Sequence, residues 1–261
     1  MNDYLSASWR CVGTVLIILF LARAQVCLAD LSSSEVTGML TAHNDVRASA
    51  APSAADMTRL VWDASRASVA QSWANQCNFS HNANRNANYA ALSSNSGGVG
   101  ENIDITTGTR ASALSGANSA VGLWPAEASA YHFATNTCAS GQVCGHYTQL
   151  AWANTLHVGC GITQCPTVIG ASGFNNAQVV ICDYNPAGNF VGQRPHVQGA
   201  PASQCPAGLP DNIDNLCSPA VGGPAHARTV SAVPPLGLAV FALALAGIAW
   251  RTSIARTASR D

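Results

Sequence analysis

The chain has 261 residues, of which 48% are hydrophobic and only 10% are charged, and its formal net charge is −1. It contains no lysine, and its 12 arginines are scattered singly. Nucleic-acid binding needs a clustered basic face that displaces counterions from phosphates, so this composition excludes nucleic acid as a partner.

Residues 1–29 have the pattern of a secretory signal peptide. Arg10 precedes an apolar run, and small residues lead up to Ala29. A signal anchor is the alternative, but the apolar run is short for a membrane span. We expect cleavage after Ala29, which places the mature chain in the secretory pathway.

A capping-box pattern predicts the first helix. Ser32 can accept a hydrogen bond from the backbone of Glu35, whose carboxylate can reach back to the backbone of Ser32. Apolar residues at helical spacing continue to about Ala48. His43 falls on the inward face of this helix, and we interpret it as a core histidine held by a hydrogen bond.

The second helix is expected to begin at Asp63, an N-cap residue. Val69, Trp73 and Cys77 follow one another at helical spacing, which predicts one apolar stripe. Trp62 and Trp73 are interpreted as core residues.

The middle of the chain combines a glycosylation signal, a loop and an alanine-rich region. Asn78 begins an N-glycosylation sequon and is predicted to carry a glycan. Residues 82–98 are rich in Asn, Ala, Ser and Gly and are expected to form a loop. Residues 111–134 are predicted to be helical, with a helix end or restart near Glu127 caused by Pro125.

Two later segments, 157–165 and 177–184, alternate between apolar and polar residues and contain Val and Ile, as antiparallel strands do. Helices that flank a small sheet make the fold class α+β. Residues 198–228 then shift to Pro, Gly, Ala and Ser, with Cys205 and Cys217 as the only anchors. This composition predicts a linker or stalk.

Residues 229–250 contain no charge and are long enough to cross a bilayer, which takes about 20 residues. Arg251, Arg256 and Arg260 follow, as in a cytoplasmic tail over residues 251–261. A removed GPI signal is the alternative, but an arginine-bearing tail is unusual for such a signal. We therefore expect a single-pass transmembrane anchor.

The chemistry of the chain is concentrated in the stretch GHYTQLAW at 145–152, which contains His146 among a hydroxyl, an amide and two aromatic groups. A second histidine, His81, lies upstream. The chain has three glutamates, and two of them, Glu101 and Glu127, lie between these two histidines.

Three of these residues, Glu101, Glu127 and His146, belong to motifs that resemble the CAP superfamily, which comprises the cysteine-rich secretory, antigen five and pathogenesis-related class 1 proteins. The motifs are GHYTQLAW at 145–152, GEN at 100–102, W-x-x-E at 124–127 and VVICDYNPAGNF at 179–190. The resemblance runs from about Glu35 to His196 and looks strongest to the plant pathogenesis-related branch. Asp183 departs from the pattern, because the family usually has Asn or another uncharged or basic residue there.

The resemblance implies a three-layer α-β-α sandwich with a small antiparallel sheet for residues 30–197. Eight cysteines remain once residues 1–29 are removed, and an even count in a secreted chain indicates a disulfide framework whose pairing the sequence leaves open. The resemblance implies the pairs Cys77–Cys165, Cys138–Cys144 and Cys160–Cys182, which leaves Cys205–Cys217 as a fourth pair.

His81, Glu101, Glu127 and His146 match the family's cleft of two histidines and two glutamates. Neutral imidazole suits zinc, and a nearby carboxylate either ligates the metal or orients the ring. Two histidines alone leave open positions, so we expect His81 and His146 to bind zinc weakly and no cofactor to be required. The alternative is a buried hydrogen-bond network that holds the helices to the sheet.

The resemblance implies binding of sterol- or fatty-acid-type lipids or of a partner, in defence or host interaction. The predicted signal peptide and anchor would make the protein extracellular and membrane-tethered. A zinc-dependent hydrolase or protease, with Glu101 or Glu127 as general base, is a second hypothesis. Against it, the H-E-x-x-H arrangement and a recognisable nucleophile motif are missing. A third is the precursor of a signalling peptide, because residues 182–196 resemble one released from plant relatives. We favour the first, which is not an enzyme.

Overall fold

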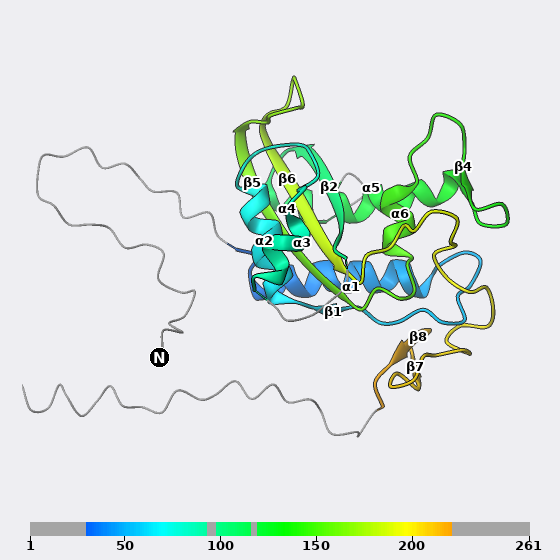
Figure 1. Ribbon diagram of the computed structural model, residues 1–261. Helices are drawn as coiled ribbons and strands as arrows, with labels where there is room; N and C mark the ends of the chain where they lie inside the picture. The colour runs from blue at the N-terminus through cyan, green and yellow to red at the C-terminus, as the bar shows by residue number, and fades with distance from the viewer. Residues whose placement is uncertain (1–29, 93–97, 116–118, 221–261) are drawn as a thin grey trace, which may run out of the picture. The chain divides into compact units, whose positions relative to one another are not determined.

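The computed structural model describes residues 30–92, 98–115 and 119–220. Within these ranges a four-stranded sheet, in the order β1-β5-β6-β2, separates two groups of helices (Figure 1). The elements are α1 (Ser33–Ala48), β1 (Val61–Trp62), α2 (Ala64–Ala74), α3 (Arg85–Ala90), β2 (Gly100–Thr107), α4 (Arg110–Leu114), α5 (Ala120–Ala126), η1 (Glu127–Ala130), β3 (Tyr131–His132), β4 (Thr137–Cys138), α6 (Gly145–Leu150), β5 (His157–Thr167), β6 (Asn175–Asn185), β7 (Asp211–Ile213) and β8 (Leu216–Ser218).

The centre of the sheet is the antiparallel pair β5–β6, in which Cys160 lies opposite Cys182. The two strands predicted over 157–165 and 177–184 are therefore confirmed. β2 pairs with the other edge of β6, also antiparallel. β1 joins β5 in parallel through two residues, so this small sheet is not purely antiparallel.

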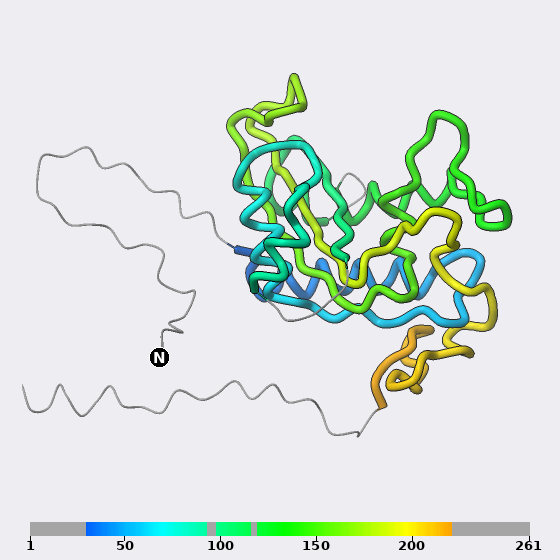
Figure 2. The backbone as a smooth tube through the Cα atoms, viewed as in Figure 1, coloured from blue at the N-terminus to red at the C-terminus, as the bar shows by residue number. Residues whose placement is uncertain are grey.

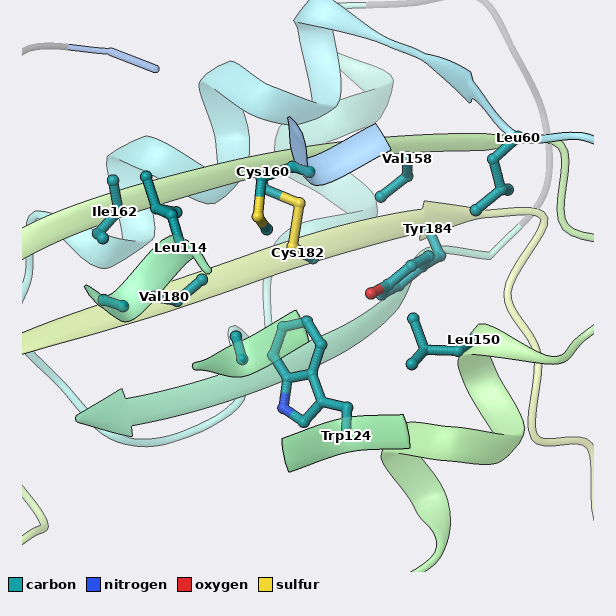
Figure 3. Packing of buried hydrophobic residues seen from close by; sticks show 13 residues of the cluster. Leu60, Leu114, Trp124, Leu150, Val158, Cys160, Ile162, Val180, Cys182 and Tyr184 are labelled. Atoms are coloured by element: carbon teal, nitrogen blue, oxygen red, sulfur yellow. A yellow bond between two sulfur atoms is a disulfide. The ribbon is translucent and has the colours of Figure 1, made fainter. Parts of the chain in front are cut away.

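Each face of the sheet buries its own apolar cluster. On one face Val180 and Tyr184 pack against Met39 of α1 and Trp124 of α5. Figure 3 shows Trp124, Leu150 and Tyr184 on the same side of the sheet as the Cys160–Cys182 disulfide.

On the other face Val179 and Ile181 pack against Ala70 and Ala74 of α2. Both faces of the sheet are thus covered by helices, which confirms the predicted three-layer α-β-α sandwich.

Three disulfides join the pairs that the resemblance implied, Cys77–Cys165, Cys138–Cys144 and Cys160–Cys182. The fourth joins Cys205 and Cys217, the pair that was left over. All four, together with the apolar clusters of the described residues, lie between residues 30 and 220. This unit therefore has its own core and its own covalent framework.

The predicted helix starts are confirmed. Ser32 and Glu35 form both halves of the capping box of α1. Asp63 caps α2 by accepting from the backbone of Ser65 and Arg66. The apolar stripe predicted through Cys77 is wrong, because α2 ends at Ala74 and Cys77 has a left-handed φ of 52°. Trp62 and Trp73 are only half-buried and pack at the edges of the two clusters.

Two of the other local predictions need correction. The loop predicted over 82–98 contains α3, which is held in place by the buried ring of Tyr89. The alanine-rich region 111–134 is helical only in pieces and ends in the short strand β3. Its predicted break is confirmed, since α5 ends at Ala126 and η1 starts at Glu127.

Residues 198–220 differ from the stalk that their composition predicts. They run back along the segment 53–59 (Figure 2), where the backbone of Met57 accepts from Cys217 and that of Ala55 accepts from Gln204. The hairpin β7–β8 follows, and Leu216 and Cys217 are fully buried. A Pro- and Gly-rich segment packs in this way because one apolar side chain and one disulfide fix it.

The predicted signal peptide at 1–29 and the predicted anchor at 229–250 lie outside the described residues. Within the part of the chain that is described, no helix is long and apolar enough to cross a bilayer.

Candidate functional site

The first histidine of the predicted cleft is paired with a glutamate of the sheet. Glu101 is the second residue of β2, and its side chain is buried. Its Oε1 lies 2.8 Å from Nδ1 of His81 and accepts from the backbone N–H of Asn82 at 2.9 Å. The imidazole of His81 is 60% exposed. A buried carboxylate thus orients a histidine ring that faces solvent.

The second histidine is paired in the same way, at the start of a helix. Oε1 of Glu127 lies 2.6 Å from Nδ1 of His146, while its Oε2 accepts from the backbone N–H groups of His146 and Tyr147. Glu127 therefore caps the free amides in the first turn of α6 as well as orienting the ring. The indole of Trp124 stacks on His146, with ring centroids 5.9 Å apart.

The GEN motif connects the two pairs because successive side chains of a strand point to opposite faces. Glu101 points towards His81, and the next residue, Asn102, donates to the backbone carbonyl of His146 at 3.1 Å. The structure thus brings the four predicted residues together as two pairs, His81–Glu101 and His146–Glu127. Among the described residues, no three of the four have their ligand atoms within 4.8 Å of one another.

Asn102 also contacts a buried chain of hydrogen bonds. Its amide donates to the hydroxyl of Tyr184 at 3.4 Å, and that hydroxyl lies 2.9 Å from Nε2 of His43. Nδ1 of His43 lies 2.7 Å from the carbonyl of Met39, which can only accept. Burial lowers the pKa of His43 to about 4, so its ring is neutral. The interpretation of His43 as a core histidine is confirmed.

Metal binding at the two histidine–glutamate pairs depends on the ring nitrogen that the carboxylate leaves free. With Nδ1 held by a carboxylate, Nε2 of His81 and of His146 is the nitrogen that would coordinate a metal, as in carboxylate–histidine–zinc arrangements. A second cluster of ligand atoms, from His43, Cys160 and Cys182, does not fit a metal because its two sulfurs form a disulfide. The weak zinc site at His81 and His146 stays a prediction.

A third carboxyl group lies at the His81–Glu101 pair. Asp183 of β6 is the register partner of Glu101, and both of its carboxyl oxygens are buried without a hydrogen-bond partner. Burial, and then the neighbouring Glu101, raise the pKa of Asp183 well above its usual value. The motif showed Asp183 as a departure, but its proximity to Glu101 follows only from the strand register.

Among the described residues, no nucleophilic side chain is bonded to the imidazole of His81 or His146. Among the described residues, no hydrogen bond joins a serine hydroxyl or a cysteine sulfur to the ring of His81 or His146, and the described cysteines form disulfides. At Ser80 the backbone carbonyl accepts from the indole of Trp73. Both glutamates are engaged by the histidines and by backbone amides. The glycan predicted on Asn78 stays a prediction.

Comparison with known proteins identifies the family. The profile described as "CAP: Cysteine-rich secretory protein family" matches residues 40–184. The chain is 35% identical to "Peptidase inhibitor 16" of Bos taurus, over 84% of this chain and 43% of that protein. It is 37% identical to "GLIPR1-like protein 1" of Homo sapiens, over 74% of this chain and 78% of that protein. The chain thus spans less than half the length of peptidase inhibitor 16.

Solved structures agree with this result. "Crystal Structure of Na-ASP-1" aligns with a TM-score of 0.56 at 24% identity, over 78% of this chain and 52% of that one, which shows the fold. "Crystal structure of NaASP2 with Zn2+" aligns with a TM-score of 0.51 at 26% identity, over 72% of this chain and 97% of that one. The narrower resemblance to the plant branch stays a prediction.

Proposed function

The chain belongs to the CAP family of cysteine-rich secretory proteins, and we propose that it is an extracellular, membrane-tethered protein that binds a sterol- or fatty-acid-type lipid. Its disulfides fit the oxidising secretory pathway. The tether would be the apolar segment at 229–250.

One observation carries the lipid proposal. A cavity of about 400 Å³, most of whose lining is apolar, lies between the start of the sheet and the C-terminal segment. Pockets of roughly 300–1,000 Å³ that are lined by apolar side chains and a few polar groups are the usual form of a small-molecule site.

The hydrolase hypothesis is less well supported than binding. That hypothesis makes Glu101 or Glu127 the general base, and such a base must have a free carboxylate oxygen within reach of the attacking water. Glu127 instead accepts three hydrogen bonds, two of them from the first turn of α6. Glu101 uses Oε1 for both His81 and the backbone of Asn82, and its Oε2 is buried away from solvent. Both carboxylates therefore hold the fold and the rings, which favours a binding protein over an enzyme.

The peptide-precursor hypothesis would require residues 182–196 to leave a packed structure. Residues up to Asn185 belong to β6. At the other end, His196 is buried, its Nε2 lies 2.9 Å from the carbonyl of Pro52, and its ring stacks on Phe133. Release would break these contacts, so this hypothesis is the least favoured of the three.

Weak zinc binding is a second property that we propose, because both rings have Nδ1 held by a carboxylate. The solved NaASP2 structure, to which the chain is similar, contains Zn²⁺. Isothermal titration of zinc into the protein should show binding that His146→Ala abolishes. If lipid binds elsewhere, the same variant should keep its lipid affinity, and a folded variant that lost both would contradict separate sites.

The experiment that tests lipid binding is equilibrium titration of labelled cholesterol and labelled palmitate against residues 30–220, with the disulfides intact. We expect saturable binding that unlabelled lipid competes away. A protein that is folded by circular dichroism and binds neither lipid would contradict the proposal.

A further inference from the structure

A cavity that the two histidine–glutamate pairs do not use lies beside α6, and we refer to it as the loop cavity. Its volume is about 340 Å³. Gly145, Thr148 and Trp152 of the motif GHYTQLAW line it. Asn189 and Phe190, the last two residues of the motif at 179–190, line it as well. Two motifs that are far apart in the sequence therefore meet at one cavity.

Side-chain hydrogen bonds hold the loops around this cavity in place. The hydroxyl of Thr148 donates to Oδ1 of Asn189 at 2.7 Å, and Nδ2 of Asn189 donates to the carbonyl of Gly145 at 2.8 Å. Nδ2 of Asn136 donates to the carbonyl of Gln193 at 3.0 Å. Because these contacts are internal to the protein, the cavity is formed before a ligand arrives, which reduces the ordering that binding would cost.

One aromatic ring of the lining is open to solvent. Phe190 is 53% exposed, and its ring centroid lies 5.9 Å from that of the buried Trp152. A ring that packs on a buried indole is fixed in position, and it gains free energy when a ligand with an apolar face removes it from water. Phe190 is therefore a fixed apolar surface at the edge of the cavity.

The polar groups of the loop cavity carry no charge. The described residues that line it include no Asp, Glu, Arg or His. Gln142 and Gln193 are exposed, and within the described ranges neither of their side-chain amides bonds to another protein group. A primary amide offers both donors and an acceptor. The neighbouring Arg194 does not line the cavity, and its Nε donates to the carbonyl of Phe133 at 2.8 Å.

An open aromatic ring beside free amides, without charge, is complementary to a sugar. A pyranose ring has a face of C–H groups that packs on an aromatic ring, and its hydroxyls both donate and accept hydrogen bonds. We propose that the loop cavity binds a neutral oligosaccharide, with one sugar ring on Phe190 and its hydroxyls at the amides of Gln142 and Gln193. An acidic or sulfated glycan would meet no cation in this lining. The ligand class is separate from the lipid proposed above, so either proposal can fail without the other.

The test starts with a glycan array that carries neutral, acidic and sulfated oligosaccharides, probed with residues 30–220 with the disulfides intact. We expect binding to neutral glycans, and the best of them is then titrated by calorimetry. Phe190→Ala removes the apolar surface and should weaken that glycan about tenfold. Gln142→Leu keeps the size of the side chain but removes its hydrogen bonds, and should weaken the glycan by about two- to tenfold.

The matched control is Phe79→Ala, which removes the same side chain at a position that is 37% exposed and outside this lining. It keeps the Asn78 sequon and should leave the glycan affinity unchanged. Near-ultraviolet circular dichroism shows whether each variant is folded.

Three results would overturn the inference. A folded protein that binds no neutral glycan contradicts the ligand class, and so does a preference for sulfated glycans. Equal affinities in Phe190→Ala and Phe79→Ala would mean that the sugar binds elsewhere. Labelled palmitate, titrated against the same proteins, reports on the lipid proposal independently, and its affinity should not change in Phe190→Ala.

Discussion

At the scale of single residues, Asp183 is the position where this chain departs from the motif, and the departure has a physical cost. The carboxyl is 1% exposed and lies opposite Glu101 across β2 and β6. The charges of Arg85 and Arg66 lower its pKa, but burial and Glu101 outweigh them, so the pKa is raised. A raised pKa means that folding favours the protonated acid. The protonated carboxyl of Asp183 therefore contributes fully to stability at pH values below its pKa in the unfolded chain. That contribution is lost as the pH rises through its pKa in the folded protein.

Asp183→Asn should therefore stabilise the protein at neutral pH and change it little near pH 4, because Asn has nearly the same shape and never ionises. The gain at pH 7.5 should be on the order of 1 kcal/mol or more, because Asn removes the cost of either ionising or protonating the buried acid at that pH. Thermal unfolding at the two pH values measures it. Asp45→Asn, on the exposed face of α1, is the control and should show no such difference. An equal shift at both pH values would contradict the explanation.

His43 predicts a pH dependence of the opposite sign. Its pKa is lowered from 6.5 to about 4 by burial, so the unfolded chain takes up a proton first as the pH falls. Stability should therefore decline between pH 6.5 and 4, by about 3 kcal/mol at most. Urea unfolding across this range should show a shallower decline in His43→Gln, which cannot titrate, whatever the absolute stability of that variant. A parallel decline in both proteins would assign the effect to other groups.

At the scale of elements, the contact between α2 and β5 depends on glycine. A Cβ atom added to Gly161 would overlap the backbone of Gln71 in α2. Gly161→Ala should push the helix away from the sheet and destabilise the protein by about 1–3 kcal/mol. That corresponds to a fall in Tm of about 2–4 °C for each kcal/mol.

Gly38 of α1 provides the control with the opposite sign. A Cβ there would meet nothing within 4 Å, so Gly38→Ala should raise the stability by up to about 1 kcal/mol through helix propensity. Differential scanning calorimetry of both variants separates close packing from propensity. A Gly161→Ala protein as stable as the parent would show that α2 can move without cost.

Elements with local signals could be predicted from the sequence, and those that depend on tertiary contacts could not. The start of α1 was predictable because Ser32 and Glu35 bond to each other across one turn. β2 was missed because Glu101, Asn102 and Asp104 read as polar loop residues, yet the sheet buries them. α3 was missed because a six-residue, Asn-rich helix has little propensity and is fixed by the burial of Tyr89.

The same division applies to the candidate site. The motifs select Glu101, Glu127 and His146, and the match to the family's cleft adds His81. The pairing of each glutamate with its histidine depends on the strand register and on the capping of α6 by Glu127. Both are tertiary contacts, so the sequence did not predict them. Composition also predicted a stalk wrongly over 198–220. The Pro and Gly content of a segment indicates how stiff its backbone is, but it does not show whether the side chain of Leu216 is buried in a core.

At the scale of the whole molecule, the C-terminal segment belongs to the folded unit, and this changes where the domain should end. Leu216 is 1% exposed and packs with Met57 and Tyr147. The Cys205–Cys217 disulfide and the backbone bonds from Cys217 to Met57 and from Arg59 to Cys217 hold it there. A domain that ended at the predicted boundary, Val197, would leave Met57 uncovered.

A chain of residues 30–197 should therefore unfold at a clearly lower temperature than one of residues 30–220. Burial of Leu216 alone is worth about 2–5 kcal/mol by analogy with core Leu→Ala changes, and the short disulfide loop adds about 2–3 kcal/mol. Leu216→Ala in the longer chain should give part of the loss, and the truncation should exceed it. If the two chains melted together, residues 198–220 would be a passive stalk after all.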